Sequence, residues 1–342
     1  MRALTFRDVR DVRVVDVPEP TLVEPGDVVV RVELAAICGS DLHPFRGHER
    51  GLDVGTVLGH EFQGEVVAVG ADVARWKVGD RVVAPFSTSC GACPQCLRGL
   101  TSRCERGQLF GWVQGGVGLH GGQAELVRVP LADSSLVAIP SGTDPALLFA
   151  GDILSTGMFL ADLAAVDAST SVAVVGCGPV GLMAVVAAKA RGAREVFALD
   201  VLPERLALAA AFGATPVDAA RGSDGAARAQ PRGVDAVLEA VGSPASTRLA
   251  YDLVRAGGTL AAAGVHTEDR FAITPGEVYD KNLTYRAGRA PARHFMERAL
   301  ALGQSAGIAR IVSHQLPLEA ARDGYRIFDE RLERATKVLL VP

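Results

Sequence analysis

The chain has 342 residues, of which 49% are hydrophobic and 22% charged, so it contains enough apolar material for two ordinary domains. Its 35 basic and 39 acidic side chains give a formal net charge of −4 and form no basic stripe, which argues against nucleic acid as a partner. Four arginines and two aspartates interrupt residues 1–14, so this segment lacks the apolar core of a secretory signal. We therefore expect a cytoplasmic location.

Residues 168–188 carry no charge and match a membrane-spanning helix in length. The run Gly-Cys-Gly-Pro-Val-Gly in their middle would break such a helix. A buried strand, a tight turn and a buried helix fit this stretch better, and no membrane partner is expected.

The first part of the chain, to about Leu148, is predicted to be mostly β because short apolar runs alternate with Gly, Pro and Asp turns. From about Gly151 strands alternate with helices, which predicts a doubly wound parallel sheet. The expected strands are Val28–Leu34, Gly64–Val69, Arg81–Ala84, Val172–Val175, Glu195–Leu199, Ala236–Ala240 and Thr259–Gly264, and the expected helices are Pro179–Ala190, Pro203–Phe212 and one after Pro244.

The tail after about Gly288 contains one clear helical stretch, Phe295–Leu302, and one strand, Lys337–Val341. These two elements are too little to form a core of their own. The tail must therefore pack on an earlier domain.

A glycine fingerprint follows the strand Val172–Val175 and opens the next helix; its members are Gly176, Gly178, Pro179, Val180 and Gly181. Such glycines allow a tight turn and close backbone approach to a pyrophosphate, which the helix N-terminus attracts. Asp200 ends the next strand, at the separation expected of an acid that binds the adenosine ribose, and it disfavours a 2′-phosphate. The motif predicts NAD, although Arg205 could meet either a ribose or a phosphate. The alternative is a glycine turn with an incidental capping aspartate.

Four cysteines cluster within fifteen positions, at Cys90, Cys93, Cys96 and Cys104. Four thiolates around one zinc ion leave no open position, so this spacing predicts a structural zinc site. An iron–sulfur site is a poorer match, because the bacterial ferredoxin pattern needs a shorter final spacing followed by proline. Four unrelated core cysteines are the remaining alternative.

A second group combines Cys38 with His60, two residue types that could share one zinc with a carboxylate and leave a position open. Singly, each is more often an ordinary core or surface residue. Ser40 and His43 follow the cysteine closely and could relay a proton. The presence of these two residues beside Cys38 and His60 favours a catalytic site.

In the order and spacing of these motifs the chain resembles the zinc-containing medium-chain alcohol dehydrogenases over nearly its whole length. The resemblance implies an α/β fold, with a GroES-like, mostly β catalytic domain (1–153 and 288–342) interrupted by a Rossmann NAD-binding domain (154–287). It also implies NAD, two zinc ions per chain, and a homodimer or homotetramer formed through the edge strand of the Rossmann sheet, which we place around Phe271–Ile273.

Position by position, the resemblance makes Cys38 and His60 ligands of a catalytic zinc and Asp41 the acceptor that holds the ring of His60. Glu61 matches a glutamate that lies near the metal in the family. This glutamate either binds the metal in a displaceable way or contacts the ligands around it, and it is not a permanent ligand. The best-known members have a second cysteine as third ligand, whereas this chain has Asp152, as a subset of the family does. The alternative for Asp152 is a cap for the helix beginning near Leu154.

The resemblance also implies that Ser40 takes the alcohol proton and that His43 passes it to solvent through the nicotinamide ribose. Phe86 matches a wall of the substrate pocket. Thr156 and Val265 match positions that touch the nicotinamide.

Together these features predict hydride transfer between NAD and a small alcohol, primary, secondary or polyol, giving an aldehyde or ketone. One alternative is a zinc-free quinone or enoyl reductase of the same superfamily, which metal content would distinguish. Another is a non-catalytic nucleotide-binding protein, which a turnover assay would distinguish.

Overall fold

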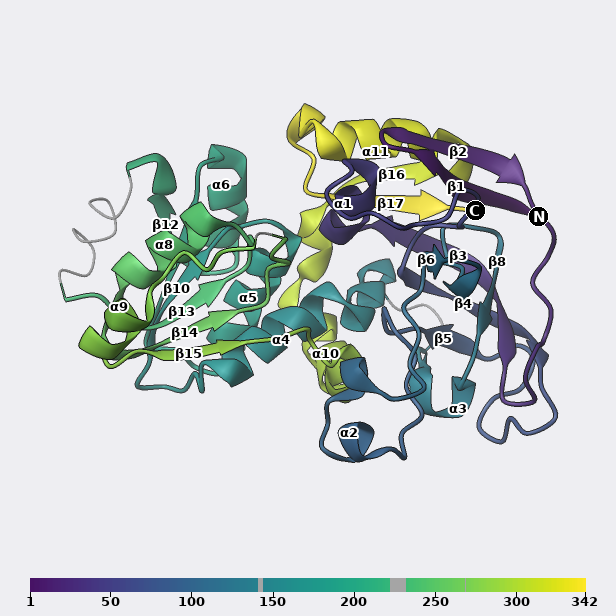
Figure 1. Cartoon of the computed structure of the whole chain (residues 1–342), viewed down its shortest axis with the longest axis horizontal. Helices are drawn as coiled ribbons and strands as arrows, with labels where there is room; N and C mark the ends of the chain where they lie inside the picture. Colours follow the sequence, from purple (N-terminus) through teal and green to yellow (C-terminus); the bar gives the residue numbers. More distant parts are fainter. Residues whose placement is uncertain (141–143, 222–231, 268) are drawn as a thin grey trace. The chain divides into compact units, whose positions relative to one another are not determined.

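The computed structural model describes residues 1–140, 144–221, 232–267 and 269–342, and the chain forms two compact units (Figure 1). Unit 1 comprises Met1–Asp152 and Pro291–Pro342, and unit 2 comprises Ile153–Ala290. The boundaries proposed from the sequence, after residues 153 and 287, compare with boundaries after Asp152 and Ala290 here. The predicted architecture, a mostly β unit interrupted by a doubly wound parallel sheet, is confirmed.

Unit 1 is built on two long antiparallel strands, β3 (Val28–Ile37) and β4 (Glu61–Val69). Its described residues form a seven-stranded sheet in the order β16-β17-β3-β4-β5-β9, with β8 paired to β3. The other strands are β5 (Arg81–Val83), β8 (Leu126–Val129), β9 (Val137–Ala138), β16 (Val312–Pro317) and β17 (Lys337–Val341), beside the pairs β1 (Arg2–Asp8) with β2 (Asp11–Asp16) and β6 (Trp112–Gln114) with β7 (Val117–Leu119).

The helices of unit 1 are short except for α10 and α11. They are η1 (Gly39–Asp41), α1 (Leu42–Phe45), α2 (Pro94–Leu97), η2 (Thr101–Arg103), α3 (Ala132–Ser135), η3 (Pro145–Gly151), α10 (Ala292–Ala306), η5 (Ile308–Ile311), η6 (Leu318–Ala320), α11 (Ala321–Asp329) and η7 (Leu332–Arg334). Strand β4 can lie close to β3 because Gly64 has no side chain. A Cβ there would lie 1.9 Å from the carbonyl oxygen of Arg31 on β3.

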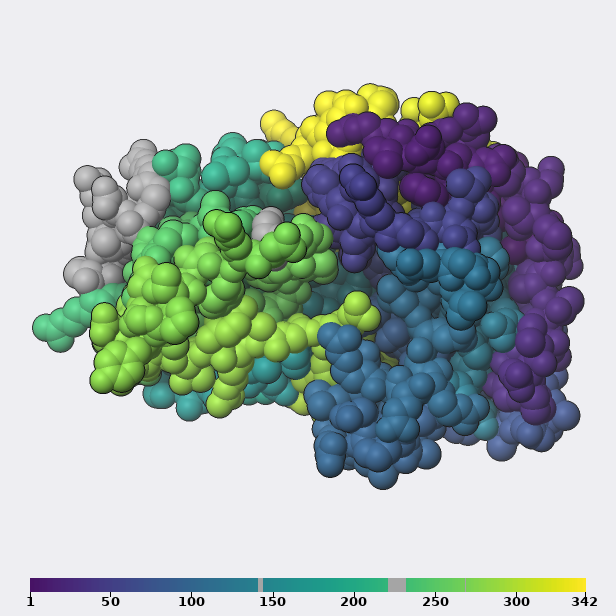
Figure 2. Space-filling view, viewed as in Figure 1, coloured from purple at the N-terminus to yellow at the C-terminus, as the bar shows by residue number. Residues whose placement is uncertain are grey.

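The returning segment contributes more than the sequence predicted. Besides the expected helix α10 and strand β17, it supplies strand β16 and helix α11. Helix α11 buries Ala321, Tyr325 and Phe328, spaced four and three residues apart, in the core of unit 1. In the space-filling view this yellow segment lies directly against the purple amino-terminal strands (Figure 2).

Unit 2 contains six parallel strands in the order β12-β11-β10-β13-β14-β15 among its described residues. The strands are β10 (Ser171–Val175), β11 (Glu195–Asp200), β12 (Thr215–Asp218), β13 (Val234–Glu239), β14 (Val254–Ala262) and β15 (Thr284–Ala287); the helices are α4 (Ile153–Leu163), α5 (Pro179–Ala190), α6 (Pro203–Ala211), η4 (Ala219–Arg221), α8 (Pro244–Leu253) and α9 (Pro275–Asp280).

The strand order of unit 2 reverses direction at β10. Since parallel crossovers are right-handed, this reversal places α5 and α6 on one face of the sheet and α8 and α9 on the other. The carboxyl end of β10, where the reversal occurs, is the place where open α/β sheets bind their ligands.

The edge strand of unit 2 was predicted around Phe271–Ile273, and this prediction is wrong. The edge strands among the described residues are β12 and β15, whereas Phe271–Ile273 leads into helix α9, where Thr274 caps the helix by accepting a hydrogen bond from the Glu277 N–H. Ile273 is buried in the core of unit 2, whereas Phe271 is half exposed and its ring lies 4.9 Å from that of Tyr285.

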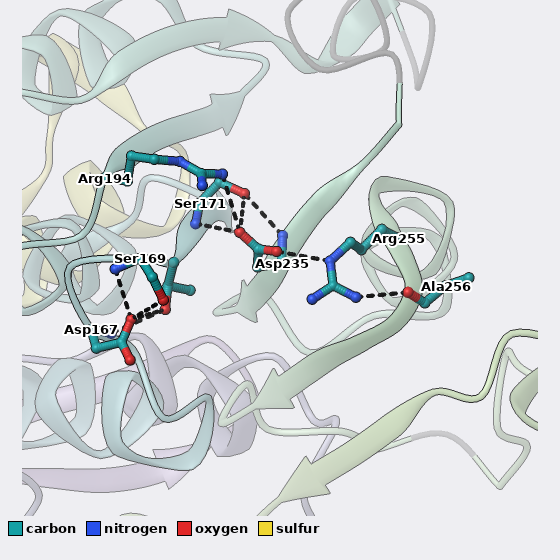
Figure 3. A network of polar contacts seen from close by, with 8 residues as sticks. Asp167, Ser169, Ser171, Arg194, Asp235, Arg255 and Ala256 are labelled. Atoms are coloured by element: carbon teal, nitrogen blue, oxygen red, sulfur yellow. Dashed lines mark hydrogen bonds and ion pairs between the residues drawn. The ribbon is translucent and has the colours of Figure 1, made fainter.

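Asp235 ties together the amino-terminal ends of the strands, opposite the reversal end (Figure 3). Its Oδ2 atom accepts hydrogen bonds from both N–H and O–H of Ser171 at 2.8 and 2.7 Å, and its Oδ1 accepts one from Arg255 Nε at 2.8 Å. Arg194 lies 3.4 Å away. These contacts hold the pKa of Asp235 at about 2, despite an opposing effect of burial.

No single helix in the described parts of the chain has the length and apolar character to cross a membrane. The bent pair Pro145–Gly151 and Ile153–Leu163 meets these criteria only by length and composition.

Candidate active site and metal centres

The four clustered cysteines come together around helices α2 and η2, and their sulfur atoms all lie within 4.8 Å of one another. The Sγ atoms of Cys90 and Cys96 are 4.0 Å apart, as are those of Cys93 and Cys104. A tetrahedral zinc–thiolate site with bonds of about 2.3 Å has sulfur–sulfur distances of about 3.8 Å. Backbone N–H donors lower the pKa of Cys93 to about 6, whereas burial and the neighbouring thiols raise that of Cys96 to about 12, the pattern of crowded thiols that lack a nearby cation. The cluster fits a zinc ion.

A second, fully buried cluster in unit 1 contains Cys38, His60, Glu61 and Asp152, with ligand atoms within 4.8 Å of one another. Strand pairing brings the first three together: Ala36 of β3 lies opposite Glu61 of β4, so Cys38, just beyond β3, lies near His60, just before β4. Asp152 follows the end of η3.

The separations in this second cluster suit a metal ion with mixed ligands. Asp152 Oδ2 lies 3.3 Å from Cys38 Sγ and 3.3 Å from His60 Nε2. Zinc bonds of about 2.0–2.3 Å in a tetrahedron give ligand–ligand distances of about 3.3–3.8 Å.

Asp41 positions two members of this cluster at once. Its Oδ1 lies 3.0 Å from His60 Nδ1, and its Oδ2 accepts the backbone N–H of Cys38 at 2.9 Å. Because Nδ1 faces a carboxylate, the favoured tautomer carries its hydrogen there and leaves Nε2 free to bind a metal. Ser40 Oγ lies 3.1 Å from that same Nε2 atom.

Lys337 is a buried cation beside this cluster that the sequence reasoning did not identify as a site residue. Its Nζ lies 2.5 Å from Glu61 Oε1 and 5.5 Å from the ring centre of Phe149. The only sequence signal is a charged residue at the start of an otherwise apolar strand, β17. The second carboxylate oxygen, Glu61 Oε2, is buried without a hydrogen-bond partner among the described residues.

The charges of the second cluster indicate a divalent ion. Cys38, Glu61 and Asp152 carry three negative charges when ionised and Asp41 behind His60 carries a fourth, whereas Lys337 supplies one positive charge, so a divalent cation would offset most of the excess negative charge. Without it, burial and the Asp152 and Glu61 carboxylates raise the pKa of Cys38 to about 11. Burial likewise raises the pKa of Glu61 to about 7, although Lys337 opposes this shift. A zinc ion fits this donor set.

Phe86 and His43 belong to the same unit as this cluster. The Phe86 ring is buried, and its centre lies 6.5 Å from that of the His60 ring, perpendicular to it. Its backbone N–H donates to Gly151, next to Asp152. His43 lies on α1, two residues beyond Asp41 and partly exposed.

In unit 2 the glycine fingerprint forms the turn between β10 and α5. Gly176 has φ +89°, and a Cβ on Gly181 would lie 1.7 Å from the Gly176 carbonyl oxygen, so both positions require glycine. Gly178 caps α5, and Pro179 and Val180 begin it. Because the helix N-terminus follows the strand end through a glycine turn in which the one intervening side chain, Cys177, is buried, the turn can hold a phosphate.

Asp200 ends β11 beside this turn, and its Oδ2 accepts the backbone N–H of Cys177 at 2.7 Å. Arg205 NH1 lies 3.9 Å from the same oxygen. Thr156 is buried on α4, and Val265 is exposed after β14. These positions describe a turn suited to a dinucleotide, with an acidic group where its ribose would lie.

Two family models of known proteins match separate parts of the chain. The family model for the alcohol dehydrogenase GroES-like domain matches residues 24–141, and that for zinc-binding dehydrogenase matches residues 179–305. Zinc-type alcohol dehydrogenase B of Aspergillus flavus is 38% identical, over 96% of this chain and 79% of its own length.

Two solved structures have the same fold over the whole chain. Alcohol dehydrogenase TADH from Thermus sp. ATN1 is 42% identical with a TM-score of 0.92, covering 100% of this chain and 99% of its own. A zinc-binding dehydrogenase of Sinorhizobium meliloti, solved with NADP, is 29% identical with a TM-score of 0.85 over 100% and 99% of the two chains. The chain therefore belongs to the zinc-type alcohol dehydrogenases of the medium-chain dehydrogenase family, a family of oxidoreductases.

Proposed function

We propose that the chain transfers a hydride between NAD and a primary, secondary or polyol alcohol, giving an aldehyde or ketone. The observation that carries this proposal is the buried group of Cys38, His60 and Asp152, with Asp41 behind the histidine. Three protein ligands of mixed type are typical of a catalytic zinc site, whose remaining position is open to substrate. A zinc-free quinone or enoyl reductase would not need these ligands, and a non-catalytic nucleotide-binding protein would not need an open metal position.

At this site a bound zinc ion would supply a Lewis acid that lowers the pKa of the substrate hydroxyl, and NAD would accept the hydride. Ser40, whose hydroxyl lies beside His60, would accept the alcohol proton, and His43 would deliver it to solvent. Phe86 would form an apolar wall that excludes water. Glu61 lies close enough to approach the metal but is held by Lys337.

The four cysteines Cys90, Cys93, Cys96 and Cys104 would hold a second zinc ion. Their closed shell leaves no position for substrate, so the role of this ion is structural. The proposed content is two zinc ions per chain.

Unit 2 would bind NAD through the turn Gly176–Gly181, with Asp200 accepting hydrogen bonds from the adenosine ribose. A carboxylate at that position repels the 2′-phosphate of NADP, which supports NAD, and Arg205 would lie beside the same ribose. Thr156 and Val265 would contact the nicotinamide, as the family resemblance implies. The free edge of β15 is the surface that we propose for assembly into a homodimer or homotetramer.

The test is an NADH-fluorescence screen of purified protein against a panel of alcohols, paired with zinc analysis. We expect turnover with NAD, and loss of turnover and of one zinc ion in Cys38→Ala. The matched control is Cys177→Ala, which removes a buried thiol belonging to neither cluster and should keep both zinc ions. Tight nucleotide binding without turnover on any alcohol would favour a binding protein, and turnover of quinones by zinc-free protein would favour the reductase alternative.

A further inference from the structure

Asp41 has a second hydrogen-bonding partner that lies outside the motifs of the proposed site. Gln123 Nε2 lies 3.3 Å from Asp41 Oδ2, and the same nitrogen donates to the Ala36 carbonyl oxygen at 3.1 Å. Gln123 is fully buried. The side chain therefore joins the carboxylate behind His60 to the end of strand β3.

The hydrogen-bond pattern determines the orientation of the Gln123 amide. Both neighbours of Nε2 are pure acceptors, so this atom must be the amide nitrogen, and Oε1 must accept. The acceptor role is satisfied by the hydroxyl of Tyr325, which donates to Oε1 at 2.9 Å. Tyr325 is also completely buried, on helix α11.

The backbone holds Gln123 in the same place. Its N–H donates to the Leu58 carbonyl at 2.9 Å, and the Gly122 N–H donates to the Gly59 carbonyl at 2.9 Å. Gly59, with φ +94°, immediately precedes His60, and a Cβ on it would lie 2.3 Å from Gln123 Cγ. The glutamine is thus packed against the residue before one proposed ligand and bonded to the residue that orients it.

We propose that Gln123 and Tyr325 are positioning residues that hold Asp41 in the orientation needed by both Cys38 and His60. The polar chain runs from Tyr325 to Gln123 to Asp41, and Asp41 contacts the Cys38 N–H and His60 Nδ1. In a buried chain every member must be satisfied, so loss of one link removes a restraint on the Asp41 carboxylate and weakens its hold on the histidine. This inference rests on the proposed zinc site, and it gives the returning segment a role in metal binding.

The variants are Gln123→Met, which keeps the volume and removes the amide, and Tyr325→Phe, which removes only the hydroxyl. Outer partners of metal-bound histidines typically contribute about 10–100-fold to metal affinity. We expect zinc affinity at the Cys38–His60 site to fall by that range in Gln123→Met, and by about threefold to tenfold in Tyr325→Phe, one link further away. The four-cysteine zinc should be unaffected in both.

The matched control is Thr5→Val. Thr5 is buried in the same unit and donates to the Arg13 carbonyl at 3.1 Å, so this variant also removes a buried hydroxyl, but one outside the chain to Asp41. The measurement is competition with a zinc chelator on the full-length protein, with melting temperature recorded in parallel. Cobalt loaded at the same site gives an absorption spectrum that reports ligand geometry independently of turnover.

A selective loss of zinc affinity and an altered cobalt spectrum in the two variants, absent in Thr5→Val, would support the proposal. Unchanged affinity in both variants, or an equal loss at both zinc sites, would overturn it. If Gln123→Met does not fold, Tyr325→Phe alone decides. Absence of zinc at Cys38 and His60 in the unmodified protein is a different result, because it would contradict the proposed function itself.

Discussion

Lys337 Nζ lies 2.5 Å from Glu61 Oε1, and both side chains are completely buried beside the proposed catalytic metal site. Removing one partner of a buried ion pair leaves an uncompensated charge and typically costs about 3–5 kcal/mol. We expect Lys337→Met to lower the free energy of unfolding of unit 1 by that amount. Both tryptophans, Trp76 and Trp112, lie in unit 1, so urea unfolding followed by tryptophan fluorescence reports on this unit.

The double variant Lys337→Met with Glu61→Gln is the control for this prediction. It removes both charges, so most of the lost stability should return. If the double variant were as unstable as the sum of the two single variants, the residues would not be coupled.

Metal removal should distinguish the two zinc sites. A chelator is expected to remove one zinc ion per chain together with turnover, while the four-cysteine ion stays until the protein unfolds, because its shell is closed. Zinc analysis along a chelator titration, with activity measured on the same samples, checks this. Less than about one zinc per chain in freshly purified protein would contradict both assignments.

Local sequence patterns predict a structural element correctly where the residues of one short segment determine it. Pro179 at the start and the apolar run behind it predict helix α5 with the observed bounds, and the compact spacing of the four cysteines predicts their cluster. Helix α11 has no such signal, because Gly324 lies in its middle and Ala320, the residue at its N-cap, has no capping side chain. Its stability comes from packing against the core, where Gly324 lies against Ile37.

Contacts between distant segments could not be read in the same way. Residue type alone pairs Cys38 with His60, the family resemblance adds Asp152, and only the fold shows that the three ligand atoms are close. Lys337 and Gln123 have no motif of their own. Their importance comes from what burial places beside them, which no periodicity or spacing reveals.

Asp235 should make the stability of unit 2 depend on pH. Its pKa is lowered from 3.8 to about 2 in the folded chain, so its contribution is present above about pH 4 and is lost as the pH falls toward 2. Since 26% of the side chain is exposed, solvent screening reduces the effect to about 1 kcal/mol. We expect Asp235→Asn to be less stable than the unmodified protein at pH 6, with the difference shrinking between pH 4 and pH 2 (roughly the interval between the two pKa values).

Hydrogen exchange of amides in β10 and β13 measures this effect within unit 2. Tryptophan fluorescence serves as the internal control, because both tryptophans are in unit 1 and its unfolding should not respond to the substitution. A stability difference that stays constant from pH 6 to pH 2 would show that charge on Asp235 is not the cause.

Asp200 should control the choice of nucleotide. Asp200→Asn retains an acceptor for the Cys177 N–H but removes the charge that would repel a 2′-phosphate, whereas Asp200→Gly removes both. We expect both variants to reduce the preference for NAD over NADP by about tenfold or more, since like-charge contacts cost several kcal/mol. The measurement is kcat/KM with each nucleotide. Better use of NADP by the unmodified protein would refute this role for Asp200.

Asp152 is proposed as the third protein ligand of the catalytic zinc, against the alternative that it caps helix α4. Its Oδ2 lies 3.3 Å from both Cys38 Sγ and His60 Nε2, so the three atoms are close enough to bind one metal ion. Asn caps a helix as well as Asp does, so a purely capping residue would tolerate Asp152→Asn. A ligand would not, because the amide removes a negative charge from the site.

We therefore expect Asp152→Asn to weaken zinc binding at this site by at least about 100-fold and to abolish turnover, while the four-cysteine zinc remains. Asp152→Cys should retain zinc, because a thiolate restores the charge. The chain offers a matched control at the other end of η3, where Asp144 Oδ1 accepts the Ala146 N–H at 2.8 Å as a cap; Asp144→Asn should change neither metal content nor turnover. Normal zinc content and turnover in Asp152→Asn would mean that Glu61 or water completes the metal shell.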